Sequence, residues 1–419
     1  MFNILLVGAG DRGMIYAKQS LVTPDIFKIV GVVEPSDTRR NAAGELFGIP
    51  EDKRFRSVKE AADAPKFADA IFNCTMDAMH ADTTIPFLDK GYHALLEKPI
   101  ANNISDVDRI YRAALKNKST VMICHVLRYA PFYKKIKEAI VSGEIGEIKN
   151  IQMADQVSYF HASVSYVRGK YGDPDICGSG MLLSKCSHDI DLMAWLMGGN
   201  RAKNVFSSGS TMQFREENAP EGAADRCLPD CIYKDCCEYS AKKLYIDYPQ
   251  RWANRVWNDC DLVGASDEKK TASLEDVNNQ YGRCVYKSNM KIVDHQSVLV
   301  EFENGATGTF SMTAGSAVSG RTIHVIGTKG EIEGAFQDEK FVIRKIAPQL
   351  PGGFEEKVVD LSNVQKKDAH GCGDKLLLGD FWALLGGKTP SVCCTSLEDS
   401  LLGHEILFRA EDFREKYGK

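Results

Sequence analysis

The residues Asn3-Ile4-Leu5-Leu6-Val7-Gly8-Ala9-Gly10-Asp11-Arg12-Gly13 decide the fold of the first part of the chain. An apolar run that stops at a glycine-rich turn and continues into a helix-compatible segment predicts a strand, a tight turn and a helix. In the pattern Gly-x-Gly-x-x-Gly, the glycines allow the turn, the close approach of a pyrophosphate and the packing of helix on strand, while the helix N-terminus faces the anion. We therefore expect a dinucleotide at this turn, bound by Gly8, Gly10, Asp11, Arg12 and Gly13.

The next apolar run indicates which dinucleotide binds. Residues Ile29 to Val33 read as a second strand that ends at Glu34, 21 residues after Gly13. An acidic side chain at this position accepts a hydrogen bond from a ribose 2′-hydroxyl and repels a 2′-phosphate. The sequence thus favours NAD over NADP. Arg39 and Arg40 weaken that preference, because a nearby arginine pairs well with a phosphate.

The alternation of strands and helices predicts a parallel, doubly wound sheet up to about residue 125. Three further strands are expected at Ala70–Cys74, His93–Leu96 and Thr120–Cys124, with a helix at Ser105–Asn117. Beyond residue 125 the pattern changes to strands with little helix between them. This second part is expected to be an α+β domain with a mainly antiparallel sheet, built from a helix at Phe132–Ser142, strands at Ile148–Ser158, Ser297–Glu303, Ala306–Thr313 and Arg321–Ile326, and helices at Asp374–Leu385 and Leu397–Tyr417.

The composition is that of an ordinary globular protein of 419 residues, with 44% hydrophobic and 26% charged residues, and it excludes disordered and fibrous classes. A net charge of −5 without long blocks of one sign argues against nucleic acid as a partner. No run approaches the roughly 18 apolar residues that cross a bilayer, so no membrane partner is expected. Thirteen cysteines and an N-terminus without a basic leader predict free thiols in the cytoplasm.

A series of motifs continues from the glycine turn through most of the chain. Thr75-x-Asp77-x-x-His80, Gly91-Tyr92-His93 and Glu97-Lys98-Pro99 follow predicted strands, and Arg128, Gly143-x-x-Gly146 and Gly327-Thr328-Lys329-Gly330 come later. This series resembles the Gfo/Idh/MocA family, the group of glucose-fructose oxidoreductase and inositol dehydrogenase.

The resemblance implies an NAD-binding Rossmann domain over residues 1–125. An open-faced α/β domain for substrate binding and oligomerisation would follow over residues 126–419, with C-terminal helices at 374–419 packing back on the body. It also implies a tightly held nicotinamide cofactor, oxidation of a sugar or cyclitol hydroxyl, and a homodimer or homotetramer. The family's motif places Thr75, Asp77, His80, Glu97 and Lys98 beside the cofactor.

Two side chains are expected to handle the substrate proton. Lys98 follows a predicted parallel strand, at the sheet edge where ligands bind, and it corresponds to the family's site lysine. In many relatives an aspartate stands four residues before the motif's histidine, His188, but here that position is Ser184. Asp191, at i+3, is the alternative group that could orient His188. Lys185 lies next to the substituted position and is a third catalytic candidate.

Further polar residues are candidates for binding the hydroxyl groups of a sugar, because the string His161-x-x-x-Ser165-x-Val167-Arg168-Gly169 is similar to one in sugar-directed relatives. A structural arginine in an ion pair is the alternative interpretation of Arg168. The full set of predicted substrate ligands is His125, Arg128, His161, Ser165, Arg168, Ser184, His295 and His370.

Four cysteines lie within eleven residues, at Cys227, Cys231, Cys236 and Cys237. Adjacent cysteines rarely both bind one tetrahedral ion, so the sequence favours a buried thiol cluster without a metal. A structural metal held by three of the cysteines and a histidine from elsewhere is the alternative.

Together these features predict an NAD-dependent oxidoreductase that acts on a ring hydroxyl of a sugar, glycoside or cyclitol. The first alternative is a redox-neutral, NAD-dependent glycosidase or lyase, which forms a transient keto-sugar, eliminates the aglycone and returns the hydride. The second alternative is a nucleotide-binding regulator without activity, and the presence of both Lys98 and His188 argues against it.

Overall fold

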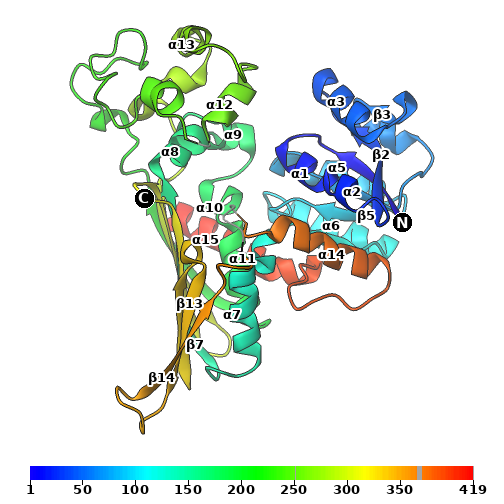
Figure 1. The fold of residues 1–419 in the computed structure, drawn as a ribbon, viewed down its shortest axis with the longest axis vertical. Helices are drawn as coiled ribbons and strands as arrows, with labels where there is room; N and C mark the ends of the chain where they lie inside the picture. Colours follow the sequence, from blue (N-terminus) through cyan, green and yellow to red (C-terminus); the bar gives the residue numbers. More distant parts are fainter. Residues whose placement is uncertain (251, 366–369, 419) are drawn as a thin grey trace.

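A computed structural model describes residues 1–250, 252–365 and 370–418. Two sheets organise the chain (Figure 1). The N-terminal sheet has the order β3-β2-β1-β4-β5-β6, and all of its strand pairs are parallel. Successive strands are added to one side of β1 up to β3 and then to its other side from β4 onward. Dinucleotides bind in the crevice at this switch between β1 and β4. The strands are β1 (Phe2–Val7), β2 (Phe27–Val33), β3 (Arg54–Phe55), β4 (Ala70–Asn73), β5 (His93–Leu96) and β6 (Val121–Ile123).

Helices cover this sheet, so its strands are buried on both faces. Residues 4 to 7 of β1 are 0% exposed, as expected for a parallel strand that reads as one apolar run. Asn103 caps one covering helix by accepting a hydrogen bond from the Asp106 backbone N–H. The main helices of this part are α1 (Asp11–Ala17), α3 (Asp37–Phe47), α5 (His80–Leu88) and α6 (Ile104–Asn117).

The second sheet has the order β14-β13-β12-β11-β7-β10-β9-β8, and its neighbouring strands are antiparallel except for the pair β7 and β10. The predicted fold class is therefore confirmed. Asn304 and Gly305 form the hairpin between β9 and β10, where Gly305 has φ +86°. The strands are β7 (Ile148–Ser158), β8 (Ala202–Ser210), β9 (His295–Phe302), β10 (Thr307–Ser316), β11 (Gly320–Gly327), β12 (Gly330–Ala335), β13 (Lys340–Ile346) and β14 (Phe354–Asp360).

A long segment joins β8 to β9, and we call residues 211–294 the β8–β9 segment. In Figure 1 it forms the green region beside α8 (Tyr159–Ala162), and it contains α12 (Ala253–Asp259) and α13 (Asp267–Glu275). A small hydrophobic core holds it against α8 and the π-helical turn Ser163–Val167. Most of its remaining backbone forms turns and short helical pieces.

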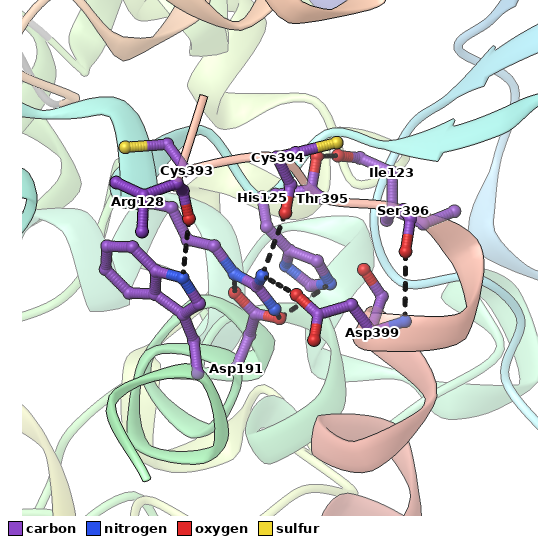
Figure 2. Close-up of polar contacts among 12 residues, drawn as sticks. Ile123, His125, Arg128, Asp191, Cys393, Cys394, Thr395, Ser396 and Asp399 are labelled. Atoms are coloured by element: carbon purple, nitrogen blue, oxygen red, sulfur yellow. Dashed lines mark hydrogen bonds and ion pairs between the residues drawn. The ribbon is translucent and has the colours of Figure 1, made fainter. Parts of the chain in front are cut away.

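The C-terminal part of the chain returns to the N-terminal sheet. On α14 (Gly373–Leu385), the Trp382 ring packs 5.5 Å from the ring of Phe2 and 4.6 Å from that of Phe27. Thr395 then pairs with β6. The Ile123 backbone N–H donates to the Thr395 carbonyl at 2.9 Å, and the Thr395 hydroxyl donates to the Ile123 carbonyl at 2.5 Å (Figure 2). The long helix α15 (Leu397–Tyr417) follows and packs on β8 and α11 (Ser187–Leu196). Among the described residues, no helix is both long enough and apolar enough to cross a membrane.

Candidate active site

The glycine turn between β1 and α1 has the geometry of a dinucleotide cradle. Gly8 has φ +91°, and a Cβ atom there would lie 2.8 Å from the Cys74 carbonyl oxygen. A Cβ atom on Gly13 would lie 2.1 Å from the Gly8 carbonyl oxygen. At Gly10, by contrast, a Cβ atom would meet no protein atom within 4 Å. Gly10 therefore faces open space at the start of α1, where a pyrophosphate can approach the backbone, and the residues present fit a dinucleotide.

Glu34 lies at the end of β2, beside this turn. Its carboxylate accepts hydrogen bonds from the Ala9 backbone N–H at 2.9 Å and from the Ser36 backbone N–H at 3.1 Å. Arg39, whose side chain is 59% exposed, pairs with the same carboxylate at 3.0 Å. Arg40 is buried, donates to the Glu34 carbonyl and pairs with Asp37. Thus a ribose would meet an acidic group here, and Arg39 is the nearby cation.

The loop after β4 is fixed to the loop that carries Lys98. The His80 ring lies between the carbonyl oxygens of Pro99, at 2.7 Å, and Thr75, at 3.3 Å. Asp77 is 8% exposed, and its Oδ2 atom has no hydrogen-bond partner in the described part of the chain. Burial raises the pKa of Asp77, and the charge of Lys98 opposes that rise. Asp77 therefore presents an unpaired oxygen beside the cofactor crevice.

Arg12 connects the glycine turn to two other parts of the chain. Its guanidinium donates to the carboxylates of Glu97 at 2.6 Å and Asp374 at 2.5 Å, and Glu97 also accepts from the Lys98 backbone N–H at 2.8 Å. Asp374 also pairs with the His370 Nδ1 atom at 2.9 Å. Although burial opposes it, the contacts with His370 and Arg12 hold the pKa of Asp374 well below its usual value. Sequence reasoning missed Asp374, although its i+4 spacing from His370 was a usable signal.

Lys98 and His188 lie near each other at the junction of the two domains. The Lys98 ammonium donates to the carbonyl oxygen of Ser184, so two of its three donors remain. Burial lowers the pKa of Lys98, against the effects of Asp77 and Glu97. His188, in the first turn of α11, is 6% exposed, and burial followed by the charge of Lys98 holds its pKa well below the usual value. The site therefore brings together the His188 imidazole, whose uncharged form is favoured, and the Lys98 ammonium, which can donate hydrogen bonds.

Two other histidines surround His188. Its ring centroid lies 6.0 Å from that of His125 and 5.6 Å from that of His370. Within the described residues, the Nδ1 atom of His188 and both ring nitrogens of His125 lack a hydrogen-bond partner. Burial also lowers the pKa of His125 well below its usual value. Burial therefore favours the uncharged form of both His125 and His188.

The expectation that Asp191 orients His188 is wrong. Both carboxylate oxygens of Asp191 accept from the Arg128 guanidinium, at 2.7 and 2.6 Å, and the next group is His125, 3.6 Å away (Figure 2). Ser184, at the substituted aspartate position, donates its hydroxyl to the Gly180 carbonyl at 3.0 Å. Neither side chain is directed to His188.

Arg128 and Arg168 both lie in the protein interior. Arg128 is 0% exposed, and its three nitrogens are satisfied by Asp191, Asp399 and the Cys394 carbonyl (Figure 2). Arg168 is 3% exposed, and each of its nitrogens also has a protein acceptor. These contacts give both arginines a structural role and occupy the nitrogens that a substrate would need.

Lys185 belongs to a buried network of charges. Its ammonium pairs with Asp155 on β7. Arg321 on β11 pairs with the same carboxylate at 3.1 Å and with Asp189 on α11 at 2.7 Å. Sequence reasoning missed Asp155, Asp189 and Arg321, because only the folded sheet brings these separate segments together. The network holds α11, and with it His188, against the sheet.

The remaining predicted ligands lie on other elements. The His161 ring stacks on Trp252, with centroids 3.8 Å apart and planes 6° apart. The Ser165 hydroxyl is buried and has no partner among the described atoms. His295 begins β9, where its ring lies 2.9 Å from Asp294 and 3.5 Å from the Ser210 hydroxyl. These contacts leave His295 apart from the lysine and histidine group.

Comparisons with known proteins cover both domains. A family model described as "Oxidoreductase family, NAD-binding Rossmann fold" matches residues 2–125, and one described as "Oxidoreductase family, C-terminal alpha/beta domain" matches residues 137–346. YteT of Bacillus subtilis (strain 168), an oxidoreductase by name, is 24% identical over 390 residues, which are 85% of this chain and 86% of that protein.

Two further similarities concern named dehydrogenases. Myo-inositol 2-dehydrogenase of Thermotoga maritima is 25% identical over 228 residues, which are 54% of this chain and 63% of that protein. A solved structure of levoglucosan dehydrogenase in complex with NADH and levoglucosan superposes with a TM-score of 0.70 at 17% identity, covering 99% of this chain and 97% of that one. The structural similarity shows a shared fold.

Proposed function

Because the chain belongs to the Gfo/Idh/MocA family of oxidoreductases, we propose that it oxidises a ring hydroxyl of a sugar, glycoside or cyclitol with NAD. The observation that carries this proposal is that the buried His188 imidazole lies within the electrostatic influence of the Lys98 ammonium, and that Glu97, next to Lys98, is bound by Arg12 of the glycine turn. The inositol and levoglucosan dehydrogenases among the similar proteins support a polyhydroxylated ring as the substrate. We also propose a location in the cytoplasm, where buried thiols such as those of Cys124 and Cys186 stay reduced.

When bound, NAD supplies the acceptor for the hydride. Gly10 leaves room for the pyrophosphate, and Glu34 accepts a hydrogen bond from the adenosine ribose. Lys98 holds the substrate oxygen with a donor that Ser184 does not occupy, and the neutral His188 imidazole takes the hydroxyl proton. His125 and His370 line the same group of rings, and we assign to them the neighbouring hydroxyls.

We call the residues proposed to contact the substrate ring the substrate wall. His161 and Ser165 form the part of this wall that is farther from Lys98 and His188. A stacked pair of rings, His161 on Trp252, offers a flat face of the kind that packs against a sugar ring. The buried Ser165 hydroxyl offers a donor and an acceptor. Lys185 is given an indirect role, since its ion pair with Asp155 positions the start of α11.

The experiment is a substrate panel with the purified chain and either NAD or NADP. Accumulation of NADH with a free sugar, glycoside or cyclitol is the expected result. Release of an aryl leaving group without net NADH, together with solvent deuterium in the sugar, would instead establish the redox-neutral glycosidase or lyase. Faster turnover with NADP would show that Arg39, rather than Glu34, decides the cofactor.

A further inference from the structure

Four cysteines of the β8–β9 segment line one small cavity: Cys227, Cys231, Cys237 and Cys284. The cavity measures about 20 Å³, room for roughly one water-sized particle. Cys227, Cys231 and Cys284 are 7–8% exposed, and Cys237 is half-buried. The fourth thiol therefore comes from Cys284, far along the segment, and not from Cys236.

The backbone places Cys227 and Cys284 on the same face of a short antiparallel bridge. Arg226 pairs with Arg283, the Cys227 N–H donates to the Gly282 carbonyl at 2.9 Å, and the Cys284 N–H donates to the Asp225 carbonyl at 2.8 Å. This pattern makes the two cysteines diagonal neighbours, about 7–8 Å apart. A disulfide needs Cβ atoms about 3.5–4.5 Å apart, whereas two thiolates that share one metal ion span a larger gap.

A turn decides which of the two adjacent cysteines faces the cavity. The backbone N–H groups of Cys236 and Cys237 both donate to the Tyr233 carbonyl, at 3.1 and 2.8 Å. Cys237 points inward, and its sulfur accepts a hydrogen bond from the Tyr239 N–H at 3.3 Å. Cys236 is exposed, with its sulfur 3.7 Å from the Tyr233 carbonyl. The adjacency of the pair is therefore no obstacle to a single site.

A buried positive charge lies against these thiols without a carboxylate partner. Arg168 is 3% exposed and donates to the Cys227 sulfur at 3.4 Å. Its other acceptors are the Tyr245 hydroxyl and the carbonyl oxygens of Arg283 and Tyr239. Among the described residues no aspartate or glutamate forms an ion pair with it. A buried charge is costly unless an opposite charge accompanies it, and thiolates would supply that charge.

Another cluster of possible metal ligands has its charges already balanced. Among the described residues, the one group of three possible ligand atoms that all lie within 4.8 Å of one another is Asp155, Cys186 and Asp189. Any three sulfur atoms of the cavity cysteines are spread more widely than this in the structure. Lys185 and Arg321 neutralise the two carboxylates of that cluster. At the cavity, rotation about the Cα–Cβ bonds between staggered positions is needed to bring the sulfur atoms onto one ion.

We propose that Cys227, Cys231, Cys237 and Cys284 together bind one Zn²⁺ ion, with Arg168 as the neighbouring counter-charge. Four thiols each lose a proton to solvent and form four Zn–S bonds, so the site carries a net charge of −2, which Arg168 offsets in part. Soft thiolate ligands in a small closed site select zinc over magnesium or calcium.

This metal would hold the β8–β9 segment in place behind the substrate wall. Arg168 directly follows the π-helical turn Ser163–Val167, which contains Ser165 and adjoins His161 on α8. Because the segment has little regular secondary structure, a metal that joins its two ends supplies stability that a small hydrophobic core cannot.

The test measures zinc in the full chain after expression with added zinc and purification under reducing conditions. We expect about one zinc per chain in the parent and in Cys236→Ser, whose cysteine adjoins the site without facing the cavity. Cys231→Ser and Cys284→Ser are expected to lose zinc about tenfold or more. Equal losses in Cys236→Ser and Cys231→Ser, or a parent without zinc after incubation with the ion, would overturn the proposal.

A second measurement avoids variants that fail to fold. The parent is treated with a chelator and titrated with Co²⁺ alone, which takes the place of zinc and reports its ligands by absorption. Thiolate-to-cobalt charge-transfer bands and protection of about four thiols from a thiol reagent are expected. Cobalt bound without such bands, or thiol reactivity that is the same with and without metal, would also overturn the proposal.

Discussion

Replacement of His188 by asparagine tests whether the buried imidazole takes the substrate proton. His188 is 6% exposed, and burial and the charge of Lys98 keep its pKa well below the usual value, so the ring is ready to accept a proton at neutral pH. Loss of a positioned general base slows a reaction by about 10²–10⁴-fold. At about 1.36 kcal/mol for each factor of ten, this is about 2.7–5.4 kcal/mol of transition-state stabilisation.

The assay compares NADH formation by the parent, His188→Asn and His324→Asn. His324 is the matched control, because it lies on β11 and pairs with Glu331 at 3.2 Å, outside the site. We expect His188→Asn to lose most of kcat, while its affinity for NADH, measured by fluorescence titration, stays near that of the parent. His324→Asn should keep the parent's kcat. A kcat for His188→Asn close to that of the parent would refute this role of the imidazole.

The pH dependence of the parent provides an independent check on the same histidine. Because the pKa of His188 is lowered, the ring becomes protonated only at a pH below about 6.5, the ordinary pKa of histidine. The base form, and with it kcat/KM for oxidation, should therefore persist to lower pH and fall only on the acid side of about pH 6.5. An acid limb with its midpoint at or above that value would contradict the assignment.

Three further predictions concern the cofactor and the core. Gly10→Ala should unfold at the same temperature as the parent, because a Cβ atom there meets no protein atom within 4 Å, yet bind NAD at least about tenfold more weakly in calorimetry; unchanged affinity would place the pyrophosphate elsewhere. Asp191→Ala should lower the free energy of unfolding, measured in urea, by about 3–5 kcal/mol, because it leaves Arg128 buried beside a single carboxylate. Asp399→Ala should lower it by less, because the Asp399 carboxylate is 41% exposed. The reverse order would contradict the network in Figure 2. Glu34→Ala should raise the preference for NADP by freeing Arg39, and an unchanged ratio of the two KM values would count against the role of this carboxylate.

The parallel sheet could be predicted because its signals are local. Each of its longer strands is a short apolar run, and the residues that follow these runs, such as Gly8, Glu34 and Lys98, lie at one edge of the sheet. The outer strands of the second sheet gave no such signal. In β14 six of the seven residues are exposed, so the strand has no apolar face to detect and depends on its pairing with β13.

The candidate site could be predicted only in part, since several of its contacts join distant segments. Lys98 and His188 were found through motifs. The pair of Arg12 and Asp374 spans 362 residues, and no sequence period connects them. The roles of Arg128 and Arg168 depend on burial, because an arginine that binds a ligand and one that holds the core have the same local pattern.

In the proposed reaction, a hydride passes from a ring carbon to NAD while Lys98 holds the oxygen. The most direct measurement uses the substrate found in the panel, deuterated at the oxidised carbon, and mass spectrometry of the cofactor after turnover by the parent and by Lys98→Met. We predict deuterium in the NADH formed by the parent and a rate about 10²–10⁴-fold lower for Lys98→Met. NADH without deuterium, or equal rates for the two proteins, would contradict the claim.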